Sequence, residues 1–93
     1  MMGYDRTIKL AHEQNTLALE CLKRCYVWVA ENGRDATFAG RWILGGVPVL
    51  NLSTLRARGI LERVGSSRGG HRAYYRIVDP DGVGRALVAI GLI

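Results

Sequence analysis

One glycine, Gly59, separates two hydrophobic patterns, and this junction most constrains how the 93-residue chain can fold. Before it, Leu52 and Leu55 are spaced as on one face of a helix. After it, residues 60–64 form an extended run that leads into the loop sequence GSSRGGH. Glycine suits the left-handed turn that ends many helices, because it has no Cβ to clash there. The pattern therefore predicts a helix that stops at Gly59, then a strand and a flexible loop.

The segment after this loop alternates along its length, as a half-buried strand does. Its inward set is Ala73, Tyr75 and Ile77, and its outward set is Arg72, Tyr74 and Arg76. A last helix should begin with Asp79 as N-cap and Pro80 in the first turn, where a missing N–H is tolerated. The apolar C-terminal tail is expected to pack on the main N-terminal helix or on a second subunit.

The N-terminal half predicts a core-facing helix over residues 16–31, with Asn15 as its N-cap. Its main stripe has helical spacing and comprises Ala18, Cys21, Leu22, Cys25 and Val29. A second apolar set, which includes Tyr26 and Val27, lies off this stripe and indicates cover from more than one side. That cover comes either from a partner subunit or from residues 1–15, which form an N-terminal arm or a short helix. We expect a homodimer through this helix, the C-terminal helix, or both.

Two further helices are predicted in the middle of the chain. The first runs from Phe38 to about Leu44, and Gly45-Gly46 ends it. The second covers about residues 48–58, with Pro48 in its first turn. The very short glycine-containing connection is typical of a helix-turn-helix.

This order of elements resembles the winged helix-turn-helix family of DNA-binding domains, such as the MarR-type and ArsR-type repressors. The resemblance covers about residues 16–90 and centres on Leu55-Arg-Ala-Arg-Gly59-Ile-Leu61 and the loop after it. It implies an α+β fold with a three-helix core, a two-stranded wing hairpin and a C-terminal helix. It also implies sequence-specific binding of double-stranded DNA and a role in transcription regulation. The length of the chain predicts that residues 1–93 form one domain.

The charge distribution supports a nucleic-acid partner. The net charge is +5, and residues 56–76 hold six arginines against one acid, Glu62. Arginine presents a planar fork that suits phosphate groups and guanine edges. The basic stretch coincides with the segment that carries the family resemblance.

The resemblance places a recognition helix, about residues 48–58, in the major groove, and a wing, residues 65–72, on the minor groove or the DNA backbone. The candidate DNA-binding residues are Asn51, Ser53, Thr54, Arg56, Arg58, Arg63, Arg68, His71 and Arg72. Asn51 has an alternative role as the N-cap of a shorter helix. Val49 and Leu50 depart from the family's polar recognition surface, and they contact either thymine methyl groups or a protein.

Other classes of function have weaker support. There is no nucleotide-binding glycine motif and no nucleophile–base constellation, so an enzyme is not expected. Cys21 and Cys25 make a poor metal site and are expected to be buried thiols, so no metal or cofactor is predicted. No secretory or membrane-spanning segment is apparent, which favours a cytoplasmic protein. The alternatives are a protein-interaction module and an RNA-binding protein that stacks bases on Tyr74.

Overall fold

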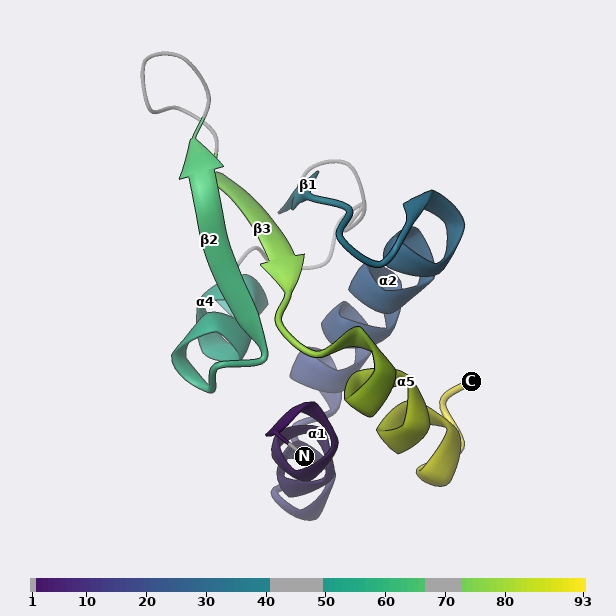
Figure 1. Cartoon of the computed structure of the whole chain (residues 1–93). Helices are drawn as coiled ribbons and strands as arrows, with labels where there is room; N and C mark the ends of the chain where they lie inside the picture. Colours follow the sequence, from purple (N-terminus) through teal and green to yellow (C-terminus); the bar gives the residue numbers. More distant parts are fainter. Residues whose placement is uncertain (1, 41–49, 67–72) are drawn as a thin grey trace.

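The computed structural model describes residues 2–40, 50–66 and 73–93, and within them the fold is α+β. Its helices and strands lie beside one another in one body (Figure 1). The helices are α1 (Met2–His12), α2 (Thr16–Asn32), α4 (Leu50–Ala57) and α5 (Pro80–Ala89). The strands are β1 (Phe38–Ala39), β2 (Leu61–Ser66) and β3 (Ala73–Ile77).

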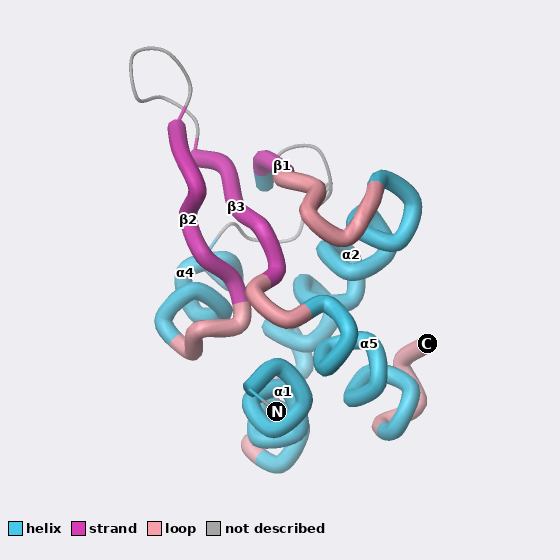
Figure 2. The backbone as a smooth tube through the Cα atoms, in the orientation of Figure 1, coloured by secondary structure: helices cyan, strands magenta, loops and turns pink. Residues whose placement is uncertain are grey.

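The three strands form one antiparallel sheet in the order β1-β3-β2. Leu61 pairs with Ile77, and both side chains are buried, so this end of the hairpin belongs to the core. The register shifts between Arg63 and Gly65, which marks an irregularity in β2. Figure 2 shows the β2–β3 hairpin extending away from α1 and α5. The sheet joins the helical body through the Leu61–Ile77 end of the hairpin and through β1, whose two residues are buried.

The sheet corrects one sequence prediction. Phe38 was expected to start a helix, but Phe38 and Ala39 form β1 and pair with Tyr75 and Tyr74. Both residues of β1 are fully buried. The pairing with β3 supplies ladder hydrogen bonds and a core position for the Phe38 ring, and this tertiary environment overrides local helix signals. The sheet therefore has three strands where a two-stranded hairpin was predicted.

The start of α2 at Thr16 is as predicted, and the helix ends at Asn32, one residue beyond the predicted end. Residues 1–15 were expected to be an arm or a short helix, and α1 shows that they are mostly helical. Asn15 caps α2, because its side-chain oxygen accepts a hydrogen bond from the Ala18 N–H at 3.3 Å. Between the helices, Gln14 has a positive φ of 57°. The N–H of Asn15 returns to the carbonyl of Leu10 at 3.1 Å, which closes the end of α1.

The end of α4 is the glycine turn that the sequence predicts. Gly59 has a φ of 73°, and its N–H donates to the carbonyl of Arg56 at 2.9 Å. The N–H of Ile60 donates to the carbonyl of Leu55 at 3.0 Å. This pair of bonds is a Schellman motif, in which the last carbonyls of a helix are satisfied as the chain reverses. Ile60 and Leu55 are both buried, so the turn also fixes how β2 leaves α4.

The hydrophobic core draws on every described helix and strand. The whole predicted stripe of α2 is buried, as are Leu52 and Leu55 of α4. Tyr75 packs against this core as predicted, whereas Tyr74, expected to be exposed, is half-buried. The remaining buried apolar side chains of the cluster are Leu10, Leu19, Phe38, Ile60, Leu61, Ile77, Val83 and Leu87.

The C-terminal segment packs on α2, which is one of the two positions predicted for it; the other was a second subunit. Leu92 lines a small apolar groove with Leu17 and Leu19 of α2. Gly91 has a φ of 79°, and it lets the chain turn back after α5. No helix among residues 2–40, 50–66 and 73–93 is long and apolar enough to cross a membrane.

Some predictions fall outside the described residues. They concern the predicted helix beyond Gly40, the glycine pair at 45–46, Pro48 and Val49, and the wing tip at 67–72.

Candidate nucleic-acid interface

Helix α4 presents a polar surface opposite its buried leucines. Ser53 and Arg56 are exposed, whereas Asn51 and Thr54 are half-buried. Asn51 lies inside α4, which begins no later than Leu50, so its alternative role as an N-cap is wrong. The surface of α4 is thus formed by the candidate residues that the sequence assigned to base and phosphate contacts.

Arg58, at the end of α4, has an acidic partner. Its Nη1 donates to Oε2 of Glu13 at 2.7 Å, and its Nη2 donates to Oε1 of the same carboxylate. The hydrogen bond from Arg58 lowers the pKa of Glu13 below its ordinary value, and the same bond raises the pKa of Arg58. Arg58 was predicted to be a phosphate contact, but in the structure its guanidinium already holds a carboxylate.

The same end of α4 is also held by a residue within α1. Nη1 of Arg6 donates to the carbonyl oxygen of Gly59 at 2.9 Å. Arg6, Leu10 and Glu13 are spaced four and three residues apart, so they lie on one face of α1. The sequence prediction included neither Arg6 nor Glu13 in the site. Their helical spacing was visible in the sequence, but nothing in it indicated which helix they would meet.

Arg63 of β2 lies on the same face of the sheet as the buried Leu61, but its own side chain is exposed to solvent. It pairs with Tyr75 in the register, and opposed residues of an antiparallel pair point to the same face. Leu61 lies two residues earlier and therefore on this face too. Leu52 of α4 packs in the core that Leu61 joins. Arg63 and α4 thus lie on the same side of the sheet.

Arg56 and Arg63 differ from the other described arginines of this stretch. Both are exposed, and neither side chain makes a hydrogen bond or ion pair with a residue of the described ranges. An exposed guanidinium without a carboxylate partner keeps all its donors for a ligand. These two residues are the available cations on the described part of the predicted site.

The opposite face of the hairpin is balanced in charge. Arg76 makes an ion pair with Glu62, the residue opposite it in the register, and its Nη1 lies 3.9 Å from Oδ1 of Asp35. Cross-strand pairs of opposite charge stabilise a sheet. The basic and aromatic face predicted for β3 is therefore neutralised at Arg76.

Three of the predicted contact residues, Arg68, His71 and Arg72, lie outside the described residues.

Comparisons with models of protein families, with curated proteins and with solved structures found no match for this chain.

The two cysteines lie in the core and away from this surface. Cys21 and Cys25 are both fully buried and free. A hydrogen bond with the Cys21 thiol, together with burial, raises the pKa of Cys25, so this thiol stays protonated at neutral pH. Within the described ranges, no group of three histidine, cysteine or acidic side chains is arranged to hold a metal ion.

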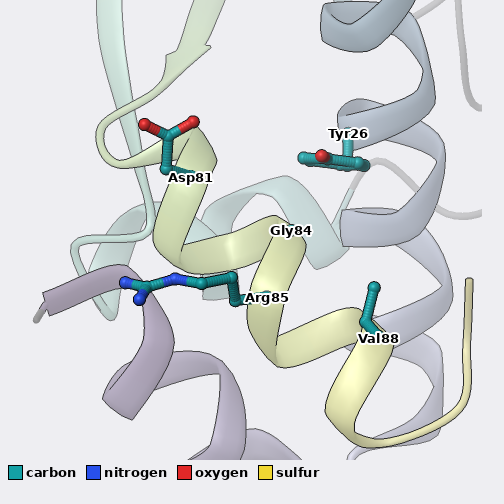
Figure 3. Close-up of a pocket in the computed structure, with 5 residues that line it drawn as sticks. All are labelled: Tyr26, Asp81, Gly84, Arg85 and Val88. Carbon is teal, nitrogen blue, oxygen red and sulfur yellow. The ribbon is translucent and has the colours of Figure 1, made fainter.

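A second surface feature is an open groove of about 460 Å³ between α2 and α5. Figure 3 shows its lining residues, with the Tyr26 ring of α2 across from Gly84 and Val88 of α5. Asp81 at one end of the groove makes an ion pair with Arg34. In Figure 1 this seam lies on the other side of the molecule from α4. The groove is therefore not part of the predicted DNA-binding surface.

Proposed function

We propose that this protein is a winged helix-turn-helix domain that binds double-stranded DNA and regulates transcription. In this proposal α4 lies in the major groove, and the β2–β3 hairpin contacts the minor groove or the backbone. The α+β layout is compatible with a winged helix, since α4 passes through a tight glycine turn into the hairpin. The observation that carries the proposal is the exposed pair of guanidinium groups on Arg56 and Arg63, which lack acidic partners among the described residues.

The roles of individual residues follow from their positions. Ser53 and Arg56 are the exposed side chains of α4 that reach bases or phosphates, and Thr54 and Asn51 lie beside them. Arg63 contacts the DNA backbone next to the wing. Arg68, His71 and Arg72 belong to the same proposal through the sequence resemblance alone.

The experiment is fluorescence anisotropy with a random-sequence duplex of about 25 base pairs over a salt series. The variants are Arg56→Ala and Arg63→Ala. The control is Arg34→Ala, which removes the same charge from an arginine that is 70% exposed and paired with Asp81. Each site variant should weaken binding and reduce the slope of log Kd against log salt by about 0.9. The control should leave this slope nearly unchanged.

Equal effects of all three variants would mean that only total charge matters, and would contradict a defined DNA-binding surface. Preference for single strands, with dependence on Tyr74, would indicate RNA binding instead. No binding by the wild type would exclude the proposed function.

The alternative is a protein-interaction module, and the exposed apolar side chains favour it. Leu17 of α2 is 60% exposed and Val88 of α5 is 62% exposed. Neither residue belongs to α4. Isolated exposed apolar residues are normal, whereas a continuous patch marks an interface. The homodimer predicted from the sequence would use these same apolar side chains of α2 and α5, and it too is a proposal. Sedimentation of wild type and Val88→Glu tests it, because a dimer through α5 should dissociate in the variant.

A further inference from the structure

The ion pair between Glu13 and Arg58 joins a residue just after α1 to the end of α4. Both oxygens of the carboxylate accept from the guanidinium, which makes the pair bidentate. The Arg58 side chain is 34% exposed and the Glu13 side chain 36% exposed, so the pair lies at the surface. A ligand in solution can therefore reach both groups.

The carboxylate occupies the part of Arg58 that best fits a phosphate. A guanidinium binds carboxylate and phosphate groups through the same planar fork of two N–H donors. Glu13 engages both terminal nitrogens, Nη1 and Nη2. A DNA phosphate can take this end of the guanidinium only if the carboxylate leaves it.

We propose that Glu13 is a built-in competitor of DNA phosphate at Arg58, so that Arg58 joins the DNA-binding surface by exchanging one anion for another. This inference rests on the proposed function, because it requires that α4 approaches DNA. Arg56 and Arg63 bind DNA directly, whereas Arg58 is released only when a phosphate is near.

The position of Glu13 suits this role. It follows the last residue of α1, and its backbone N–H donates to the carbonyl of Lys9 at 3.0 Å. The Arg6 contact with Gly59 holds the same end of α4 independently of Glu13. Loss of the Glu13 carboxylate leaves this second contact between α1 and the end of α4 in place.

The strength of the pair determines the size of the effect. An exposed ion pair favours its paired state over the separated state by at most about fivefold in the equilibrium constant, and salt weakens the pair. A competitor of this strength reduces DNA affinity moderately and does not abolish it. Removal of the carboxylate should therefore tighten DNA binding by about twofold to fivefold.

The test uses the full chain and the same duplex, with five proteins: wild type, Glu13→Gln, Arg58→Gln, the double variant, and Glu20→Gln. Glu20 is the matched control, because it is an exposed glutamate that pairs with Arg24 at 3.5 Å on α2. Removal of any acid reduces general repulsion of DNA, and the control measures that contribution. Thermal unfolding followed by circular dichroism checks that every variant is folded.

If the proposal is correct, Glu13→Gln tightens binding more than Glu20→Gln does, and this extra gain shrinks as added salt weakens the competing ion pair. In the Arg58→Gln background, loss of Glu13 should then have only the effect seen for Glu20→Gln. Three results would overturn the proposal: equal effects of the two glutamate variants, a gain that persists without Arg58, or weaker binding by Glu13→Gln. The last would mean that Glu13 orients Arg58 toward DNA.

The two proposals fail in distinguishable ways. If the wild type binds DNA and Glu13→Gln behaves like its control, only the competition at Arg58 is wrong. If no protein in the set binds DNA, the proposed function is wrong, and the competition is excluded with it.

Discussion

The carboxylate of Asp79 accepts a hydrogen bond from the backbone N–H of Gly3, 76 residues earlier in the chain, at 3.1 Å. Its other oxygen accepts from the N–H of Gly82 at 3.2 Å, which caps α5. One side chain thus satisfies a first-turn donor of both α1 and α5. Free N–H groups at helix starts carry a partial positive charge, so a carboxylate stabilises both ends. This contact connects the start of α1 to the start of α5.

Replacement of Asp79 should therefore cost two helix caps rather than one. Asp79→Ala is expected to lower the free energy of unfolding by about 2 kcal/mol, since one cap contributes about 1 kcal/mol. Asp79→Asn keeps one acceptor oxygen and should cost about half as much. Urea unfolding followed by circular dichroism measures both. A loss for Asp79→Ala no larger than that for Asn15→Ala, which removes a single cap, would contradict the double role.

Gly3 has no room for a side chain. A Cβ at this position would lie 2.8 Å from the backbone carbonyl oxygen of Asp79. Alanine normally favours a helix over glycine by about 1 kcal/mol, but here the clash with backbone should reverse the sign. Gly3→Ala is expected to destabilise the protein by about 1–3 kcal/mol, the usual cost of overpacking.

The control for Gly3 is Gly65→Ala in β2. A Cβ at Gly65 would have no atom within 4 Å among those described, so this variant should be nearly neutral. Urea unfolding curves of the two variants compare their free energies of unfolding with that of the wild type. A stabilised Gly3→Ala protein would show that the N-terminus of α1 does not pack closely against Asp79.

Gln14 has a left-handed backbone, with a φ of 57°, in the turn between α1 and α2. A side chain disfavours this conformation by about 1–2 kcal/mol, whereas glycine tolerates it. Gln14→Gly should therefore stabilise the protein by about 0.5 kcal/mol, after the greater entropy of glycine in the unfolded chain is subtracted. Lys9→Gly, inside α1, should destabilise it by a comparable or larger amount. Destabilisation by both variants would argue against the left-handed turn.

The Glu13–Arg58 pair gives a prediction for pH. The hydrogen bond from Arg58 holds the pKa of Glu13 below its ordinary value of 4.5. A lowered pKa means that the folded state favours the charged carboxylate. The contribution to stability is therefore fully present above pH 4.5 and is lost as the pH falls through the lower folded-state pKa.

This prediction is checked by NMR titration of the Glu13 side-chain carboxyl carbon. In the wild type the midpoint should lie below 4.5, and in Arg58→Gln it should rise toward that value. A Glu13 midpoint that does not respond to the loss of Arg58 would show that the pair is absent in solution.

Much of the fold was readable from the sequence because the signals were local. The Asn15 cap of α2, the turn at Gly59, the alternation in β3 and the Asp79-Pro80 start of α5 each depend on only a few neighbouring residues. Phe38 was assigned wrongly because its strand exists only through pairing with Tyr75, 37 residues away. A two-residue strand has no periodicity of its own to detect.

The charge of the candidate site also depends partly on the local sequence and partly on contacts between distant residues. In the sequence, residues 56–76 hold one acid, so the segment reads as strongly basic. In space, Glu13 lies against Arg58, and Asp35 lies near Arg76, which Glu62 already holds. Arg56 and Arg63 keep their guanidinium groups for a ligand within the described structure. Composition along the chain therefore overestimated the basic surface.

The sequence alone determined where most helices and strands begin and end, because capping, glycine turns and hydrophobic spacing act over one or two helical turns. The tertiary structure decided which distant groups meet: Gly3 with Asp79, Glu13 with Arg58, and Phe38 with β3. These pairs lie 76, 45 and 37 residues apart. No local preference encodes such contacts, since they form only when the packing of the core brings the elements together.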